Sequence, residues 1–228
     1  LNPILNLEQI NKAVILITLF TIVCQTNVIG QCSHYSCYGQ TACFGNGAGS
    51  VNGTGDANCF FGNNSGNSNS TGNSNSFFGM NSGLNNTTGN SNSFFGREAG
   101  ENNVSGSTNS YFGRHAGHNN TTGSRNSCFG GIAGIGIDTG SYNICIGSRS
   151  GPNFGTDPSF ELFIDVYRTN FPLIHGQLDN DILTVHGDLG INTKTPQADL
   201  DVHGDGKIRA SGTNPTVELF DDTSGENR

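Results

Sequence analysis

One spacing constrains this chain more than any other feature: glycine recurs every 17 residues from Gly45 onward. The first glycine column is Gly45, Gly62, Gly79, Gly96, Gly113, Gly130 and Gly147. Two more glycine columns, an asparagine column from Asn58 to Asn143 and a column of aromatic residues keep the same spacing without an insertion. Disordered low-complexity sequence does not hold its aromatic residues in register, so the pattern predicts a repeat architecture.

The composition fits such a repeat, although by itself it resembles that of a disordered chain. Of 228 residues, 34 are glycine, while hydrophobic residues supply 33% and charged residues 12%. A unit of 17 residues is too short for a helical hairpin repeat, which needs about 30 residues or more. Each unit instead holds one short strand, such as Asn58–Phe61, followed by glycine-rich turns.

We therefore predict an all-β fold: a β-solenoid or β-roll of seven 17-residue repeats over 40–151. A turn-rich linker at 152–159 and a short-strand β stalk at 160–228 follow it. Neighbouring coils should stack at about 4.8 Å, so that like residues form ladders. Glycine should occupy corners that need unusual backbone angles, and the Asn58 column should hydrogen-bond from coil to coil.

Each strand carries two adjacent apolar residues, which must point to opposite faces. We expect one column to form the structural core: Phe44, Phe61, Phe78, Phe95, Phe112, Phe129 and Ile146. The other column then supplies candidates for an oligomer face: Phe60, Phe77, Phe94, Tyr111, Cys128 and Cys145. Because an exposed aromatic stripe is an aggregation hazard, this pairing predicts an oligomer of cyclic symmetry, with a homotrimer as the expected form. The alternative is a wide monomeric coil that covers both columns itself.

The N-terminal region carries a targeting signal. Lys12 precedes the apolar run 13–23, which is short for a transmembrane helix and fits the core of a secretory signal peptide over 1–30. An uncleaved membrane anchor is the alternative. The segment 31–39 follows, and its Cys32 and Cys37 are candidates for a disulfide in an exported chain. Cys128 and Cys145 should be neighbours on adjacent coils, either bonded or as buried thiols.

Beyond Pro158 the sequence shows short alternating strands and a weaker 17-residue echo, such as Leu183 with Leu200. This echo predicts that coil-like stacking continues in the stalk. The two His-Gly-Asp sequences at 186–188 and 203–205 would bring histidines together on a trimer axis and hold a metal there, or else form polar turns at strand ends. The polar-turn interpretation is the stronger of the two.

Several segments resemble parts of known protein families. The units Gly72–Gly79 and Ala99–Gly106 look like repeats in tail-fibre-like bacterial surface proteins. They are similar, more loosely, to the heads of trimeric autotransporter adhesins, whose repeat has a different period. The segments 161–165, 171–176, 181–187, 189–196 and 198–204 resemble the stalk of such fibre proteins. The resemblance implies a trimeric, elongated surface protein. In such fibre proteins the stalk leads to a C-terminal intramolecular chaperone domain of the endosialidase type. The sequence ends at Arg228, so we expect such a domain to lie beyond it.

Charge and motifs exclude several classes of function. The formal net charge is −8, which argues against a nucleic-acid partner. The sequence shows no serine-hydrolase elbow, phosphate-binding loop or zinc-protease motif, so we expect no catalytic residues, no cofactor and no metal. His115 and His118 occur in one repeat only and are expected to be solvated.

These observations predict an exported, non-enzymatic fibre segment with a structural and adhesive role at the cell surface or in a tail-fibre-like assembly. Repeated columns on a stiff rod suit multivalent binding to a surface glycan or a host ligand. A flat column of threonines at 54, 71, 88, 122 and 139 offers an alternative, binding to ice or another crystalline surface. A glycan-processing tail spike is a further alternative, but it needs paired carboxylates in a groove.

Overall fold

The computed structural model describes residues 40–51, 53–167, 170–203, 220–221 and 226–227. The predicted signal peptide, and the segment that contains Cys32 and Cys37, lie outside these residues. The chain divides into two compact units, Leu1–His186 and Gly187–Arg228, which we describe separately.

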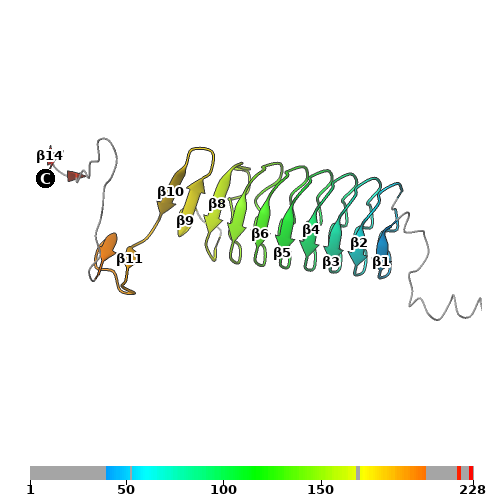
Figure 1. Cartoon of the computed structure of the whole chain (residues 1–228), viewed down its shortest axis with the longest axis horizontal. Helices are drawn as coiled ribbons and strands as arrows, with labels where there is room; N and C mark the ends of the chain where they lie inside the picture. The colour runs from blue at the N-terminus through cyan, green and yellow to red at the C-terminus, as the bar shows by residue number, and fades with distance from the viewer. Residues whose placement is uncertain (1–39, 52, 168–169, 204–219, 222–225, 228) are drawn as a thin grey trace, which may run out of the picture. The chain divides into compact units, whose positions relative to one another are not determined.

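The first unit is a parallel β-solenoid in which each 17-residue repeat makes one coil with one three-residue strand (Figure 1). Its first seven strands are β1 (Ala42–Phe44), β2 (Cys59–Phe61), β3 (Ser76–Phe78), β4 (Ser93–Phe95), β5 (Ser110–Phe112), β6 (Ser127–Phe129) and β7 (Ile144–Ile146). They pair in parallel and in exact repeat register, so that Phe77 lies opposite Phe94 and Phe78 opposite Phe95. The predicted solenoid and its coil length are confirmed.

The solenoid continues past the expected end of the repeats. Strand β8 (Glu161–Ile164) pairs in parallel with β7, with Ile144 opposite Leu162, so this coil contains one extra residue. The expected linker at 152–159 therefore lies within the last coil. Two antiparallel strands, β9 (Ile174–Gln177) and β10 (Ile182–Val185), then complete a ten-stranded sheet.

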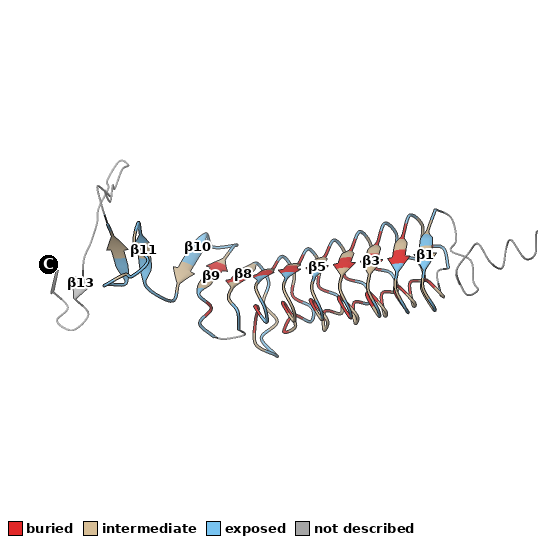
Figure 2. Cartoon of the chain, turned by 90° about the horizontal axis from the view of Figure 1, so that it is seen from below, coloured by how far each residue is buried: buried red, intermediate tan, exposed pale blue. Residues whose placement is uncertain are grey.

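Beside buried residues of the turns such as Ala99, Ala116 and Ile137, the interior contains a column of side chains from the strands, which we call the inner ladder (Figure 2). Its members are almost fully buried: Phe60, Phe77, Phe94, Tyr111, Cys128, Cys145 and Phe163. Neighbouring rings stack, with centroids 4.7 Å apart between Phe77 and Phe94 and 4.9 Å apart between Phe94 and Tyr111.

The expected roles of the two aromatic columns are thus reversed. The column from Phe44 to Ile146, predicted as the core, points outward, and the column from Phe60 to Cys145, predicted as the oligomer face, forms the core. Alternation fixes only that the two columns face opposite sides. The first and third residues of a strand share a face, so Phe78 lies on the same side as Ser76. Serine recurs at this first position in β3 to β6, and a recurring polar residue indicates the solvent side. Phe78 therefore faces solvent as well.

Glycine allows the coil to close around the inner ladder. Gly83 has φ of +58° and a Cβ there would lie 2.5 Å from the Phe77 ring, so both the backbone angle and the packing require glycine. Gly89, in the third glycine column, has no left-handed φ. A Cβ at this position would lie 2.4 Å from Asn86 Oδ1 and from the Gly106 carbonyl, so the requirement there is steric rather than conformational.

Two buried asparagine ladders tie the coils together. In the predicted ladder, Asn75 N–H donates to Asn58 Oδ1 at 2.9 Å, while Asn58 Nδ2 donates to the Gly72 carbonyl at 2.8 Å. The second ladder was not predicted: Asn86 Nδ2 donates to Asn69 Oδ1 at 2.8 Å, and the pattern repeats from coil to coil up to Asn120. Buried amides that satisfy one another in this way fix the register of the stack.

The second unit contains two small sheets. Strand β11 (Leu189–Ile191) pairs in parallel with β12 (Leu200–Val202), and β13 (Phe220–Asp221) pairs antiparallel with β14 (Glu226–Asn227). The expected 17-residue stacking does not extend into this region, because Leu200 pairs with Leu189, which is 11 residues away, and Leu183 pairs with Gly176. Among the described residues, no helix has the length and apolar character to span a membrane.

Candidate functional site

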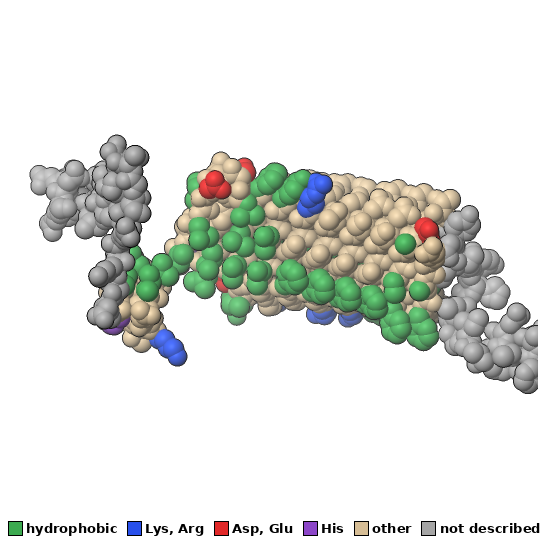
Figure 3. Space-filling model, in the orientation of Figure 1, with side chains coloured by type: hydrophobic (Ala, Val, Ile, Leu, Met, Phe, Trp, Pro, Cys, Tyr) green, Lys and Arg blue, Asp and Glu red, His purple; other side chains and the backbone are tan. Residues whose placement is uncertain are grey.

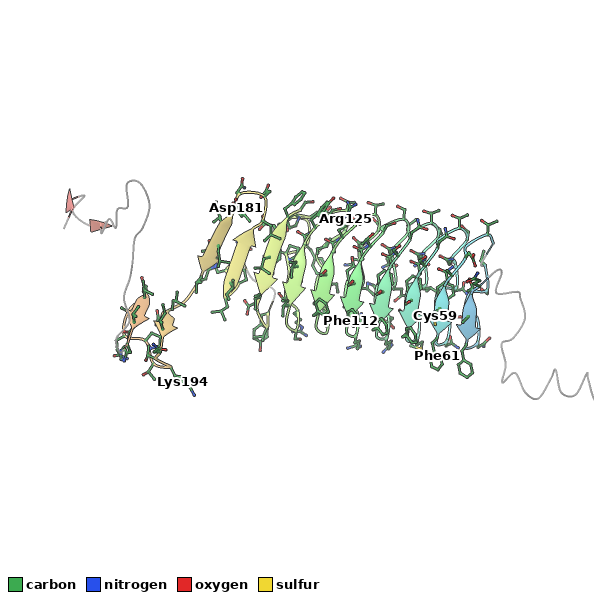
Figure 4. The ribbon with its side chains drawn as sticks, in the orientation of Figure 1. Cys59, Phe61, Phe112, Arg125, Asp181 and Lys194 are labelled. Carbon is green, nitrogen blue, oxygen red and sulfur yellow. The ribbon has the colours of Figure 1, made fainter. Side chains whose placement is uncertain are left out.

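The outward aromatic column, which we call the outer ladder, is the most extensive unusual surface of the solenoid. It consists of Phe44, Phe61, Phe78, Phe95, Phe112, Phe129 and Ile146, all exposed or half-buried. Phe61 and Phe112 project away from their strands along the same edge of the stack (Figure 4). Figure 3 shows hydrophobic side chains running as a band along the coils, on a surface with few charged groups.

The rings of the outer ladder are ordered by the strands that carry them. Centroids of Phe78 and Phe95 lie 4.8 Å apart with an interplanar angle of 4°, and Phe95 and Phe112 repeat this geometry. The fraction exposed is 51% for Phe61 and 37% for Phe112, so each ring covers its neighbours and leaves one edge to solvent. The ladder is therefore a preformed, regular apolar ridge.

A second cluster lies on the turns that follow β4 and β5. Glu98 and His115 are 17 residues apart and occupy the same place on successive coils, as do Glu101 and His118. His115 Nε2 lies 2.6 Å from Glu98 Oε2, and His118 Nε2 lies 3.2 Å from Glu101 Oε2. We call these four residues the Glu–His square.

The square corrects the expectation that both histidines are solvated. Their side chains are 21% and 24% exposed, and the two imidazole rings stack with centroids 5.2 Å apart. Burial lowers the pKa of His115 below its ordinary value; the Glu98 carboxylate opposes this shift, and Arg114, His118 and Arg97 reinforce it. The lowered pKa favours the neutral imidazole of His115 at neutral pH. The signal was present in the sequence, because each glutamate precedes its histidine by exactly one repeat.

Within the described residues, Glu98, His115 and His118 form the one group of three that offers ligand atoms all within 4.8 Å of one another. The other histidines are arranged differently. His186 contacts the Pro172 carbonyl at 2.8 Å, and His203 pairs with Asp201 at 3.1 Å, so neither joins a cluster of ligands within its unit. Gly204 and Asp205 of the second His-Gly-Asp sequence lie outside the described residues, so the polar-turn interpretation of the two sequences stays a prediction.

The cysteines of the solenoid are divided between two states. Cys43 is disulfide-bonded, whereas Cys59, Cys128 and Cys145 are free thiols. Cys128 and Cys145 lie opposite each other on β6 and β7 and fill the inner ladder in place of aromatic rings. The hydrogen bond that the Cys128 thiol donates to Cys145 and the burial of Cys128 raise the pKa of Cys128, so it stays a protonated, buried thiol.

The threonine column is exposed, as a surface-binding role would require, at positions 54, 71, 88, 122 and 139. The adjacent column changes its chemistry from coil to coil, with Ser70, Thr87, Val104, Thr121 and Asp138. The Thr87 hydroxyl donates a hydrogen bond to the Val104 carbonyl at 3.0 Å, so this donor is already used within the solenoid and is not available to a ligand. Only one threonine column is therefore both regular and open.

No protein family, characterised protein or solved structure shows a significant match to this chain. What is shown is the fold itself, a β-solenoid of 17-residue coils followed by short strands.

Proposed function

We propose that this chain is a rigid, non-enzymatic segment of an exported fibre, in which copies of the chain associate through the outer ladder. The observation that carries this proposal is the continuous exposure of the outer ladder over seven successive strands. The inner ladder and the asparagine ladders account for folding without it, so the outer ladder needs another explanation.

The size of the outer ladder suits an interface. An aromatic side chain presents about 200 Å² of surface, so seven half-exposed residues leave roughly 600 Å² of apolar area open. Exposed apolar patches of this size on a soluble protein mark interaction sites, and a stable interface buries about 800 Å² per partner. Some flanking surface would complete that area.

Other copies of this chain are the partner that fits the ladder best. The ridge is regular, with rings about one strand spacing apart, and only a surface with the same spacing meets it ring for ring along its whole length. The ridge is also narrow, because the other outward column of the same strands carries Ser76, Ser93, Ser110 and Ser127. If three such ridges meet around a common axis, their rings are buried and the serines remain exposed to solvent. We therefore propose a homotrimer.

The exported and adhesive parts of the proposal have separate support. The predicted signal peptide over 1–30 supports secretion to the cell surface, and the resemblance of the repeats to tail-fibre-like surface proteins and trimeric adhesin heads supports a fibre. A stiff solenoid presents each surface column once per coil, which suits multivalent capture of a surface glycan or host ligand. The net charge of −8 disfavours a nucleic-acid partner.

The oligomer is tested by sedimentation of the purified chain. We expect the wild-type chain to sediment as a trimer, and the double variant Phe78→Ser/Phe95→Ser to sediment as a folded monomer with an unchanged far-UV circular dichroism spectrum. The control is Thr88→Ala/Thr122→Ala, which alters another exposed column and should leave the trimer intact. A wild-type chain that is monomeric at micromolar concentration contradicts the proposal.

The exposed threonine column supports a second candidate, binding to ice or another crystalline surface. The column is interrupted by Ser105 and has no regular second column beside it. A thermal-hysteresis assay separates the two candidates, because an ice-binding solenoid shapes ice crystals and loses that activity in Thr88→Ala/Thr122→Ala. We expect no ice shaping by either protein.

A further inference from the structure

The Glu–His square has no part in the proposed association through the outer ladder. It lies on the turns after β4 and β5, where the other coils carry different residues. The place of Glu98 and His115 is taken by Asn64 and Asn81 in the coils before them. Two glutamates and two histidines thus replace the usual polar residues on one pair of coils only.

The histidines are held in the form that a metal ion needs. His118 Nδ1 lies 2.8 Å from Asn119 Oδ1 and 3.5 Å from Asn102 Nδ2. With its proton on Nδ1, the ring donates a hydrogen bond to Asn119 Oδ1. In that tautomer His118 Nε2 offers its lone pair to an ion, which would take the place of the present contact with Glu101 Oε2 at 3.2 Å. His115 Nε2 is buried and makes no well-aligned hydrogen bond, although Glu98 Oε2 is 2.6 Å away. A buried nitrogen with no aligned partner, beside a carboxylate oxygen, is what an ion between them would explain.

We propose that Glu98, His115 and His118 bind one divalent transition-metal ion, and that the ion ties the coil of β4 to the coil of β5. Two imidazole nitrogens with a carboxylate oxygen match Zn²⁺, whereas Ca²⁺ and Mg²⁺ prefer all-oxygen sites. Glu101, which contacts His118, adds negative charge beside the ion.

The site must adjust slightly to admit the ion. Zn²⁺ bonds of about 2.0–2.2 Å separate tetrahedral ligands by roughly 3.3 Å, so Glu98 Oε2 and His115 Nε2 need to move apart from their present 2.6 Å. These side chains are 11% and 21% exposed and end near the surface, so a small rotation supplies the space without disturbing the inner ladder.

Arg114 and Arg97 both oppose a cation here. Arg114 is exposed, so solvent screens its charge. Arg97 pairs with Glu98, and this limits its effect. Its guanidinium contacts Glu98 Oε1 at 2.5 Å, which leaves Oε2 directed at the histidines. The arginine side chain is 52% exposed, so solvent screens its charge. In this position it orients the carboxylate as an outer-shell partner would.

Titration of the full, untagged chain with Zn²⁺ tests the proposal. Calorimetry should show one high-affinity ion per chain, and the thermal unfolding midpoint should rise with Zn²⁺ concentration. In His115→Asn/His118→Asn both effects should vanish. This variant is expected to fold, because Asn64 and Asn67 already occupy the same places in the coil of β2. Loading with Co²⁺ in place of Zn²⁺ should give visible absorption bands that the variant lacks.

Two further variants sharpen the assignment. Asn119→Ala removes the partner of His118 Nδ1 and should weaken Zn²⁺ binding by about 10–100-fold while binding persists. His175→Asn is the matched control, because His175 forms a separate pair with Glu161 at 2.6 Å, and its loss should leave the affinity unchanged. Absence of Zn²⁺ binding by the wild-type chain, or equal affinity in His115→Asn/His118→Asn, overturns the proposal.

Discussion

The inner and outer ladders are made largely of the same residue on the same strands, yet they differ completely in environment. Phe94 is fully buried, whereas its neighbour Phe95 keeps an edge in solvent. Ring stacking is equally close in both ladders, at 4.7 Å between Phe77 and Phe94 and 4.8 Å between Phe78 and Phe95. Stacking is therefore a consequence of the 17-residue register. Burial alone distinguishes the inner ladder, which forms the core of the chain, from the outer ladder, which we propose as the interface.

Phe94→Ala should have the largest effect on stability. It removes a fully buried ring from the middle of the inner ladder and leaves a cavity between the rings of Phe77 and Tyr111. We expect the free energy of unfolding to fall by about 3–5 kcal/mol. Urea unfolding followed by circular dichroism measures this loss.

Phe95→Ala is the matched control for that comparison, because it removes the same atoms from the other side of the same strand. At concentrations where the chain is monomeric, the expected loss is below about 1 kcal/mol, since the ring leaves solvent only in part on folding. Equal losses for the two variants would show that the outer ladder also belongs to the core of the single chain.

Gly100→Ala should have the next largest effect, by acting on the backbone that encloses the inner ladder. Gly100 has φ of +56°, and a Cβ there would lie 2.5 Å from the Phe94 ring. The left-handed conformation alone costs about 1–3 kcal/mol for a residue other than glycine, and the clash adds to it. Thermal unfolding should therefore show a lowered midpoint.

Gly131→Ala provides the control for Gly100→Ala. Gly131 has no left-handed φ, and the nearest atom to a Cβ at this position is the Arg114 carbonyl oxygen at 4.0 Å. Its stability should stay within about 0.5 kcal/mol of the wild type, as for most surface substitutions. A large loss of stability in Gly131→Ala would mean that any side chain at a glycine position in these turns destabilises the fold, whether or not it meets a neighbouring atom.

The sequence was sufficient to predict the coil length, the parallel stacking and the first asparagine ladder, because each depends on strict periodicity. As we interpreted it, the sequence was not sufficient to predict which side chain of each strand points into the core, since Phe77 and Phe78 are chemically identical. Only the polar Ser76, two residues before Phe78, distinguishes the two faces. The short strands at Ile174 and Ile182 were expected, but their antiparallel pairing depends on a turn that no repeat specifies.

The Glu–His square shows a different limit of prediction. The 17-residue period places Glu98 beside His115 and Glu101 beside His118, so these contacts were available from the sequence. What the period does not give is the approach of His115 to His118 across the turn, since this depends on the conformation of the two intervening residues, Ala116 and Gly117. A column-by-column comparison of the repeats singles out the charged pairs, because no other coil has a glutamate or a histidine at these positions.

Tyr111→Phe should stabilise the chain, because it repairs a defect in the inner ladder. The Tyr111 hydroxyl is buried without a well-aligned hydrogen-bond partner. Burial and the nearby Cys128 raise its pKa well above the ordinary value, and a hydrogen bond from the Asn126 side chain opposes this shift only in part. Removing a buried unsatisfied hydroxyl should raise the free energy of unfolding by about 1 kcal/mol. The reverse change one coil earlier, Phe94→Tyr, should lower it. A loss of stability in Tyr111→Phe would show that the hydroxyl has a partner, such as a buried water.

Asp157→Asn should have the smallest effect, and one that depends on pH. Asp157 lies in the last coil, where it contacts the turn that carries Thr139. Burial opposes ionisation of this carboxylate, but the Thr139 hydroxyl and the backbone N–H groups of Asp138, Gly140 and Thr139 together lower its pKa below the ordinary value. A carboxylate whose pKa is lower in the folded state stabilises that state above its unfolded pKa of about 3.9, and the contribution disappears as the pH falls through the lower folded value. At pH 6 the wild-type chain should therefore unfold at a higher urea concentration than Asp157→Asn. The difference between the two midpoints should shrink below about pH 4. A difference that is constant from pH 6 to pH 3 would show that the side chain acts at the end of the stack through its shape and not through its charge.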